Sequence, residues 1–314
     1  MSRIRDTHAG DRVFAASVRA MAWALAALLG LIGLFLLKQA WPALSKFGPA
    51  FFSTSLWNPV EEVFGAAPVI YGTVVSSLLA ILIAAPLSIG AALFLNELAP
   101  RPVARVLGFL LQMLSAIPSV VYGLWGIFVL APWLRVTVEP FLASSLGLGF
   151  LPFFRGPAYG VGMLAAGVIL AIMITPTIAS ISVEVFRAIP RSQREAALAI
   201  GSTRWEMIRI SVLASARAGL FGAVMLGLGR ALGETMAVTM VIGNRAEISA
   251  SLFAPAQTMS SVIANEFAEA TGDLHLSSLA AVGLALFGVT FVLNAAARIL
   301  VWRVTERRAR ARSA

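Results

Sequence analysis

Six long apolar stretches, separated by short segments rich in polar or basic residues, dominate the sequence. They lie near residues 18–37, 69–95, 106–130, 159–183, 219–242 and 277–301. A helix needs about 20 apolar residues, at about 1.5 Å each, to cross a hydrocarbon core of about 30 Å. Each stretch reaches that length, so the pattern predicts an all-α membrane protein with six transmembrane helices.

The first stretch follows arginines and therefore has the general form of a secretory signal peptide. Its apolar run over 21–37 exceeds the usual length of about 7 to 15 residues, and no A-x-A-like cleavage motif follows it. We therefore expect this stretch to be retained as a membrane helix.

The distribution of basic residues predicts the orientation of the six helices. Of the 24 lysines and arginines, 18 lie on the inner side and five on the outer side if both termini are cytoplasmic. Cytoplasmic loops of membrane proteins carry such an excess of basic residues, and the opposite orientation would invert the ratio. The sequence therefore predicts a multi-pass membrane protein in the N-in/C-in orientation.

Composition removes several other classes of protein. Hydrophobic residues make up 59% of the chain and charged residues 12%, against roughly 45–50% and about 25% in soluble domains. The net charge of +9 comes from residues that flank apolar runs, which favours a membrane surface over nucleic acid. There is no cysteine, and the two histidines, His8 and His275, are far apart. We therefore expect no disulfide, no metal site and no cofactor.

Prolines and glycines interrupt the apolar stretches. Pro86, Pro118 and Pro176 each remove a backbone hydrogen bond from a predicted helix, which is compatible with ordinary packing irregularity or with a moving pathway. Gly229 and Gly233 form a G-x-x-x-G pair. That spacing predicts close contact with another helix.

The basic loop over 184–217 contains two signals for the start of a helix. Ser192 with Glu195, and Thr203 with Glu206, have the spacing of capping boxes. The glycine between them, at position 201, can adopt the left-handed conformation that ends a helix. We expect a helix, a glycine turn and a second helix, which either dock into the groove of a partner or lie on the lipid headgroups.

This loop resembles the EAA signature of ABC-importer permeases. Glu195, Ala196 and Ala197 are followed by Gly201 at the family spacing, in the cytoplasmic loop before the penultimate apolar stretch. Further segments are similar to the permeases of phosphate-specific transport systems, and the likeness runs from about residue 51 to the last stretch. These segments are residues 115–123, 229–238, 242–244 and 265–269.

The resemblance implies a MetI-like ABC-importer permease fold, a place in the bacterial inner membrane and a set of partners. These are a second permease subunit, a cytoplasmic ATPase dimer, an external phosphate-binding protein and membrane lipid. Glu195, Ala196, Ala197 and Gly201 would couple the permease to the ATPase. The chain departs from the family pattern at Ser211 and Ala214, where the family has isoleucine and proline, so the second loop helix is free to continue toward the fifth stretch.

The expected division of the chain follows from these assignments. Residues 1–17 form a cytoplasmic tail, 18–302 the permease domain and 303–314 a basic cytoplasmic tail. No lysine follows a glycine, so the Gly-Lys-Ser/Thr element of a P-loop is absent. We therefore expect a transport subunit without an ATPase site of its own.

Two ionisable residues lie within the fifth stretch, Arg230 and Glu234. At i and i+4 on one helix they are expected to pair. One interpretation is a neutral pair that locks two helices together. The other places both residues in the translocation pathway, where the planar guanidinium of Arg230 binds a tetrahedral oxyanion.

Alternatives to a phosphate importer remain open at this stage. An intramembrane arginine does not distinguish phosphate from sulfate or molybdate. A secondary transporter would be expected to carry coupling acids in more than one stretch, and only the fifth has such residues. A scaffold that reports phosphate status to a signalling partner is the third possibility.

Overall fold

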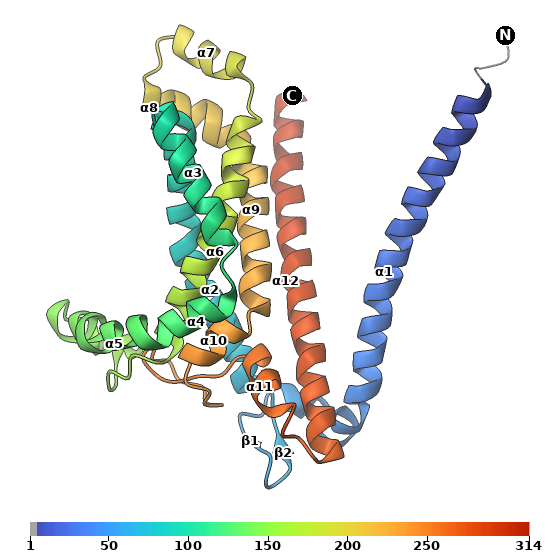
Figure 1. The fold of residues 1–314 in the computed structure, drawn as a ribbon, viewed down its shortest axis with the longest axis vertical. Helices are drawn as coiled ribbons and strands as arrows, with labels where there is room; N and C mark the ends of the chain where they lie inside the picture. Colours follow the sequence, from blue (N-terminus) through green and yellow to red (C-terminus); the bar gives the residue numbers. More distant parts are fainter. Residues whose placement is uncertain (1–4, 314) are drawn as a thin grey trace.

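The computed structural model describes residues 5–313, and within them the chain is mostly helical (Figure 1). The α-helices are α1 Arg5–Phe47, α2 Ala67–Leu93, α3 Arg101–Ser115, α4 Ser119–Trp125, α5 Ala131–Trp133, α6 Met163–Arg187, α7 Arg191–Ala199, α8 Arg204–Met207, α9 Ala214–Gly233, α10 Met236–Val241, α11 Met259–Glu266 and α12 Asp273–Ser313. Two short antiparallel strands, β1 Trp57–Asn58 and β2 Val63–Phe64, form a hairpin. Tighter 3₁₀ turns lie at Gly48–Phe52, Leu148–Phe150 and Pro152–Phe154, and wider π turns at Phe94–Leu98, Gly126–Leu130, Leu134–Val138, Phe141–Ser145 and Ile208–Leu213.

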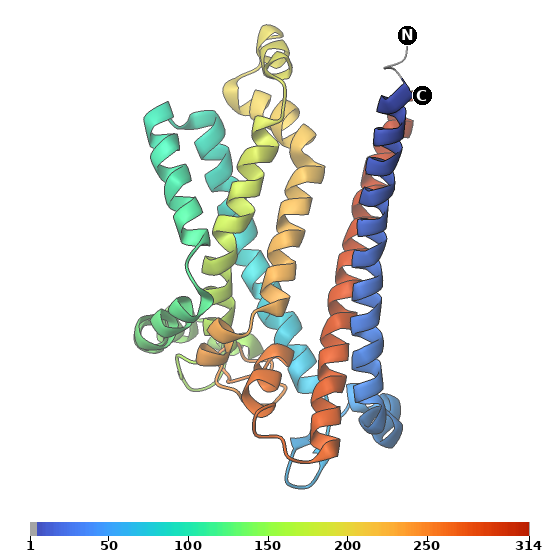
Figure 2. The same cartoon turned by 45° about the vertical axis from the view of Figure 1, so that its right-hand side comes forward.

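In the part of the chain that the structure describes, six helical segments are long and apolar enough to cross a membrane, as predicted. They are Gly10–Phe52, Ala67–Leu98, Ser119–Ser145, Met163–Arg187, Arg204–Gly233 and Asp273–Ala296. The start of α1 and the end of α12 lie at the same end of the molecule as α7, and the β1–β2 hairpin lies at the other end (Figures 1 and 2). This arrangement agrees with the predicted N-in/C-in topology. We call the end that carries α7 the cytoplasmic end.

The third apolar stretch is not one helix, which corrects the prediction for residues 106–130. Helix α3 ends at Ser115, and a new helix starts at Ser119, directly after Pro118. Proline lacks the N–H needed to continue a helix and disfavours helical geometry in the residue before it. The segment from α4 through α5 therefore turns aside and lies across the end of the bundle opposite α7 (Figure 1). Helix α3 is the part of this stretch that runs along the bundle, although Ser119–Ser145 is also long and apolar enough to cross a membrane.

The fifth stretch is also shorter than predicted at its outer end and longer at its inner end. Helix α8 continues through the π turn Ile208–Leu213 into α9, which forms one helical segment over Arg204–Gly233. This continuation agrees with the expected effect of the absent family proline at Ala214. The segment stops at Gly233, and the short helices α10 and α11 follow at the outer end (Figure 2).

Helix α6 is the centre of the bundle, because α2, α3, α9, α10 and α4 all contact it. Two thirds of the residues in the most apolar part of this helix are buried inside the chain. Glycines allow the closest approaches: a Cβ at Gly167 would overlap Leu79, and one at Gly227 would overlap Ile178. A Cβ at Gly229 or Gly233 would meet no neighbour within 4 Å among the residues that the structure describes, so the predicted close contact of the G-x-x-x-G pair is wrong within that part of the chain.

Two of the three predicted proline interruptions leave the helix continuous. Pro86 lies inside α2 and Pro176 inside α6, and only Pro118 separates two helices. Hydroxyls next to both internal prolines bind nearby backbone carbonyls: Ser88 donates to the carbonyl of Thr175, and Thr175 donates to that of Ala171. The bond from Ser88 joins α2 to α6 next to Pro176.

The helices α1 and α12 pack against each other beside the rest of the bundle (Figure 2). Both extend past the apolar cores of their stretches, since α1 starts at Arg5 and α12 ends at Ser313. The terminal segments 1–17 and 303–314 therefore contain helix wherever the structure describes them.

Candidate functional site

The cytoplasmic loop forms the predicted helix, glycine turn and helix. Helix α7 ends at Ala199, Gly201 adopts a φ of +88°, and α8 starts at Arg204. The second capping box is confirmed, because Thr203 Oγ1 accepts from the Glu206 amide at 3.3 Å and Glu206 accepts from the Thr203 amide at 2.8 Å. These reciprocal bonds define where α8 begins.

The first predicted capping box is wrong. Pro190, not Ser192, is the residue that precedes α7, and no side chain caps this helix. Ser192 already lies inside the first turn, so its hydroxyl is not placed to cap the amide of Glu195. Glu195 is exposed and is thus not explained by a local capping role.

The four residues of the EAA-like motif divide between two faces of the loop. Glu195, Ala196 and Gly201 are exposed, whereas Ala197 is 7% exposed and packs inward. Large apolar side chains close to these residues in the sequence are also exposed: Leu198, Ile200 and Trp205 are 44%, 79% and 61% exposed. An exposed apolar group of this kind beside small residues is typical of a protein interface.

Arg194 connects α7 to the rest of the bundle, and the sequence reasoning missed it. Its guanidinium contacts Glu97 Oε1 at 2.8 Å and donates to the carbonyls of Phe186 and Ile189 at 2.8 and 2.6 Å. A signal for this role was present, since Arg194 is three residues before Ala197 and therefore shares the inward face of α7.

The side chain of Arg230 lies halfway along α6. Arg230 is in the last turn of α9, and its Nη1 donates to Thr177 Oγ1 at 2.9 Å. Thr177 is 14 residues from the start of α6 and 10 from its end, which is about 21 and 15 Å along the helix. The positive charge is therefore held deep between the two ends of the bundle.

The predicted Arg230–Glu234 pair is wrong. Among the side chains that the structure describes, no carboxylate lies within 4.0 Å of the Arg230 guanidinium. An i, i+4 pair needs a continuous helix, and α9 ends at Gly233 with Glu234 in an extended conformation. The Glu234 carboxylate instead accepts from the Ala237 amide at 3.2 Å, in the first turn of α10.

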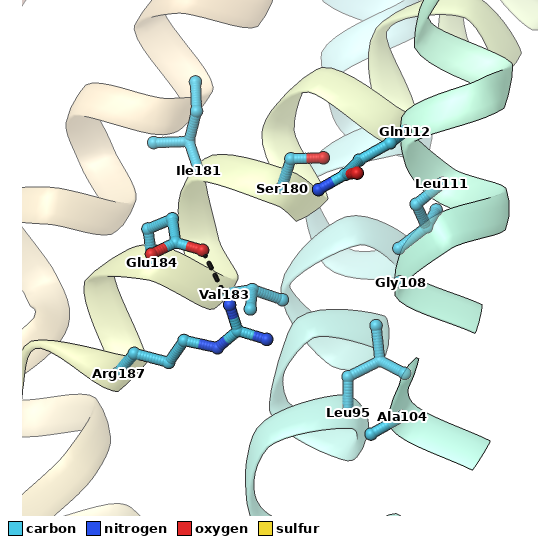
Figure 3. Close-up of a pocket in the computed structure, with 10 residues that line it drawn as sticks. All are labelled: Leu95, Ala104, Gly108, Leu111, Gln112, Ser180, Ile181, Val183, Glu184 and Arg187. Atoms are coloured by element: carbon cyan, nitrogen blue, oxygen red, sulfur yellow. Dashed lines mark hydrogen bonds and ion pairs between the residues drawn. The ribbon is translucent and has the colours of Figure 1, made fainter. Parts of the chain in front are cut away.

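A polar stripe follows α6 from Thr177 toward the cytoplasmic end. Ser180, Glu184 and Arg187 continue it at spacings of three and four residues, which places them on one side of the helix. These three residues also line a pocket of about 220 Å³ between α6, α3 and the end of α2, shown in Figure 3. Arg187 and Glu184 pair there at 2.9 Å, and Gln112 of α3 lies opposite Ser180.

The sequence is similar to a family of membrane transport proteins. The family model described as binding-protein-dependent transport system inner membrane component matches residues 84–306. The phosphate transport system permease protein PstC of Mesorhizobium japonicum is 52% identical over 299 residues, which cover 95% of this chain and 91% of the relative. PstC of Haemophilus influenzae is 43% identical over 281 residues, which cover 89% of each chain.

Solved transporters share the fold. A chain of the MetNI methionine ABC transporter, in an inward-facing conformation, matches with a TM-score of 0.59 at 16% identity, covering 79% of this chain and 99% of that one. A chain of the bacterial alginate ABC transporter in complex with its periplasmic protein matches with a TM-score of 0.60 at 17% identity, covering 97% and 99%. The predicted MetI-like permease fold is confirmed.

Proposed function

The chain belongs to the family of inner membrane components of binding-protein-dependent transport systems, and we propose that it forms half of the translocation pathway of an ATP-driven phosphate importer. Relatives at 52% and 43% identity that carry the name of a phosphate permease support the choice of substrate. The observation that carries the mechanism is the position of Arg230, a permanent positive charge deep in the bundle that no described carboxylate neutralises.

An uncompensated arginine in a membrane span is costly. Its insertion costs about 2.5–3.5 kcal/mol at the centre of a helix on translocon scales, and such residues commonly face a bundle interior or an aqueous pathway. The Thr177 hydroxyl occupies only one of the five N–H donors of the guanidinium. The remaining donors suit the two-point recognition of a tetrahedral oxyanion.

The pathway continues from Arg230 along the polar stripe of α6. A phosphate that leaves Arg230 toward the cytoplasm meets Thr177, then Ser180, and then the pocket beside Arg187. The hydroxyls of Thr177 and Ser180 and the side-chain amide of Gln112 can replace part of the hydration shell of the anion along the route. Glu234 lies at the outer side of Arg230 and orients the start of α10, so it belongs to the same pathway on the side where the anion enters.

The energy for transport comes from a separate subunit in this proposal. The chain lacks the Gly-Lys-Ser/Thr element that binds nucleotide phosphates. Glu195, Ala196, Ala197 and Gly201 would couple to a cytoplasmic ATPase, with the exposed residues on the contact surface and Ala197 holding α7 against the bundle. A dimeric ATPase with two equivalent faces needs two such loops, so a second permease subunit completes the pathway.

The outer end of the bundle is where an external phosphate-binding protein would deliver the anion. The β1–β2 hairpin, the segment from α4 to α5, and α10 and α11 all lie at that end (Figure 1). The segment over 265–269, which is similar to phosphate permeases, starts in the last two residues of α11 and continues past its end.

Reconstitution of the complete complex tests this function. The chain is co-expressed with a second permease and the ATPase of the same system, inserted into liposomes with ATP inside, and supplied with the binding protein and radiolabelled phosphate outside. We expect ATP-dependent uptake of phosphate that an Arg230→Gln variant of the assembled complex does not support. Uptake of sulfate or molybdate in place of phosphate would overturn the substrate, and uptake without ATP would overturn the coupling.

A further inference from the structure

Arg194 is the charged connection between α7 and the membrane bundle. Its guanidinium contacts three groups on two other segments: the Glu97 carboxylate at the end of α2, and the carbonyls of Phe186 and Ile189 at the end of α6. Both Arg194 Nε and Nη2 reach the same carboxylate oxygen, at 3.2 and 2.8 Å. The side chain thus joins the cytoplasmic ends of two membrane helices to the first helix of the coupling loop.

This ion pair is not a surface pair. The side chains of Arg194 and Glu97 are 17% and 7% exposed, against 63% and 69% for the Arg187–Glu184 pair on α6. The side-chain amide of Asn96 donates from Nδ2 to Glu97 Oε1 at 2.7 Å and holds the carboxylate in place. Partly buried charge pairs with several hydrogen bonds keep a defined geometry, whereas exposed pairs rearrange readily.

The other contacts of α7 are weaker and less directional. Ala197 packs into an apolar cluster with Phe186, Ile189 and Met207. Gln193 accepts a hydrogen bond from Ser215 at 3.2 Å, and both residues are exposed. Among the residues that the structure describes, Arg194–Glu97 is the one ion pair that joins α7 to another helix. Without this ion pair, α7 would be held by the apolar contact of Ala197 and by the exposed bond between Gln193 and Ser215. These contacts would allow α7 to move relative to the bundle.

The segments that Arg194 holds are connected to Arg230. Helix α6, whose last carbonyls bind Arg194, carries Thr177, the partner of Arg230. Helix α2, which continues into the π turn that contains Glu97, packs along α6. A displacement of α7 by a partner would therefore pull on the helix that positions the anion-binding guanidinium.

We propose that Arg194 is a positioning residue for coupling: it transmits the movement of α7 to α6 and α2, so that ATP hydrolysis is converted into phosphate import. The proposal rests on the proposed function above. It assigns to the inward face of α7 a role distinct from contact with the ATPase, since Arg194 points away from the exposed surface formed by Glu195, Ala196 and Trp205.

The test measures phosphate imported per ATP hydrolysed in the reconstituted complex. In the double variant Arg194→Gln/Glu97→Gln no charge is left stranded, so we expect normal insertion and normal copurification of the ATPase. Coupling free energies between sites typically correspond to factors of about 5 to 150, so we expect the import per ATP to fall about fivefold or more. The hydrolysis of ATP by the complex, stimulated by the phosphate-binding protein, should continue in this variant.

The control is Ser215→Ala. It removes the exposed hydrogen bond of 3.2 Å from Ser215 to Gln193, a weaker side-chain bond that also joins α7 to the bundle. Its import per ATP should equal that of the wild-type complex. Arg194→Lys keeps the charge but not the planar fork that reaches the carboxylate and both carbonyls, so it should give an intermediate ratio.

A covalent link tests whether the connection between α7 and the bundle, and not its charges, carries the coupling. The sequence contains no cysteine, so Glu97→Cys with Arg194→Cys introduces the only thiols in this chain. Before reaction this variant should be uncoupled. After reaction with a short bis-maleimide that joins the two thiols, the import per ATP should rise again, although neither charge has been restored.

The outcomes separate the two proposals. A wild-type ratio in Arg194→Gln/Glu97→Gln would overturn the role of Arg194 and leave the transport function intact. Failure of this variant and of Arg194→Lys to assemble would also overturn it, because Arg194 would then serve the fold alone. Absence of phosphate import by the wild-type complex would instead overturn the proposed function.

Discussion

Arg230 on α9 donates a hydrogen bond of 2.9 Å to Thr177 on α6, and this bond sets the depth of the positive charge within the bundle. The two residues are 53 positions apart in the sequence. Their contact depends on the register between α6 and α9, which the close approach of Gly227 to Ile178 maintains. Substitutions of Arg230 and of Thr177 should therefore affect transport to different extents.

Arg230→Gln removes the positive charge and the planar set of N–H donors while keeping a polar amide. We expect phosphate uptake to fall at least about tenfold, because a hydrogen bond to a charged group contributes about 1.5–3 kcal/mol. Thr177→Val removes one neutral partner and should lower uptake less. Uptake is measured in proteoliposomes with the amount of assembled complex held equal. Near-normal uptake by Arg230→Gln would mean that the arginine serves packing alone.

Glu234 should act independently of Arg230, since the two side chains bind different partners. Glu234→Gln retains an oxygen that can accept from the Ala237 amide. We expect the effect of Arg230→Gln/Glu234→Gln on uptake to equal the sum of the single effects, in free energy, within about 0.5 kcal/mol. A double variant that recovers the activity lost in the single variants would reveal an ion pair in some state of the transport cycle.

The glycine turn provides a prediction about coupling. Gly201 has a φ of +88°, and a Cβ at this position would meet nothing within 4 Å. Crowding therefore does not forbid a side chain, but the left-handed backbone costs an ordinary residue about 1–2 kcal/mol. Gly201→Val should release or uncouple the ATPase, measured by copurification and by import, while Gly201→Asn should retain both because asparagine tolerates this conformation.

The two predicted helix starts in the loop should respond differently to alanine. Thr203→Ala removes an observed cap and should cost about 0.5–2 kcal/mol of local stability, seen as faster proteolysis of the loop in the assembled complex. Thr203→Ser keeps the cap and should protect the loop. Ser192→Ala removes no capping bond and should leave the cleavage rate unchanged. Equal sensitivity at both positions would contradict the assignment of α7 as an uncapped helix.

Two glycines of α2 test the packing at the outer end. A Cβ at Gly72 would overlap the backbone carbonyl of Gln257, next to the start of α11, whereas a Cβ at Gly90 would meet nothing within 4 Å. We expect Gly72→Ala to lower the melting temperature of the purified complex, because backbone cannot move aside as a flexible side chain does. Gly90→Ala should be neutral or raise it, since alanine favours a helix by about 1 kcal/mol over glycine.

Local patterns predicted much of the loop and of the membrane topology. The six spans follow from the length of apolar runs, and the glycine turn and the Thr203 cap follow from residues within three positions of each other. The boundaries at Ser115 and Gly233 did not follow, because apolar residues resume within a few positions of each boundary. Near Ser115, the sequence does show Pro118 as a possible interruption. Whether a proline ends a helix or is accommodated within it depends on the neighbouring segments, since Pro86 and Pro176 both lie inside continuous helices.

The sequence by itself determined that this chain crosses a membrane six times, which side its basic loops face, and that an EAA-like loop precedes the fifth span. These properties depend on sums over neighbouring residues, such as the transfer free energy of 20 side chains or the charge of one loop. Only the tertiary structure decided which partner each intramembrane or loop charge has. Arg194 meets Glu97 across 97 positions, and Arg230 meets Thr177 instead of Glu234. Such pairings depend on helix register and on where a helix stops, which tight packing between distant segments sets.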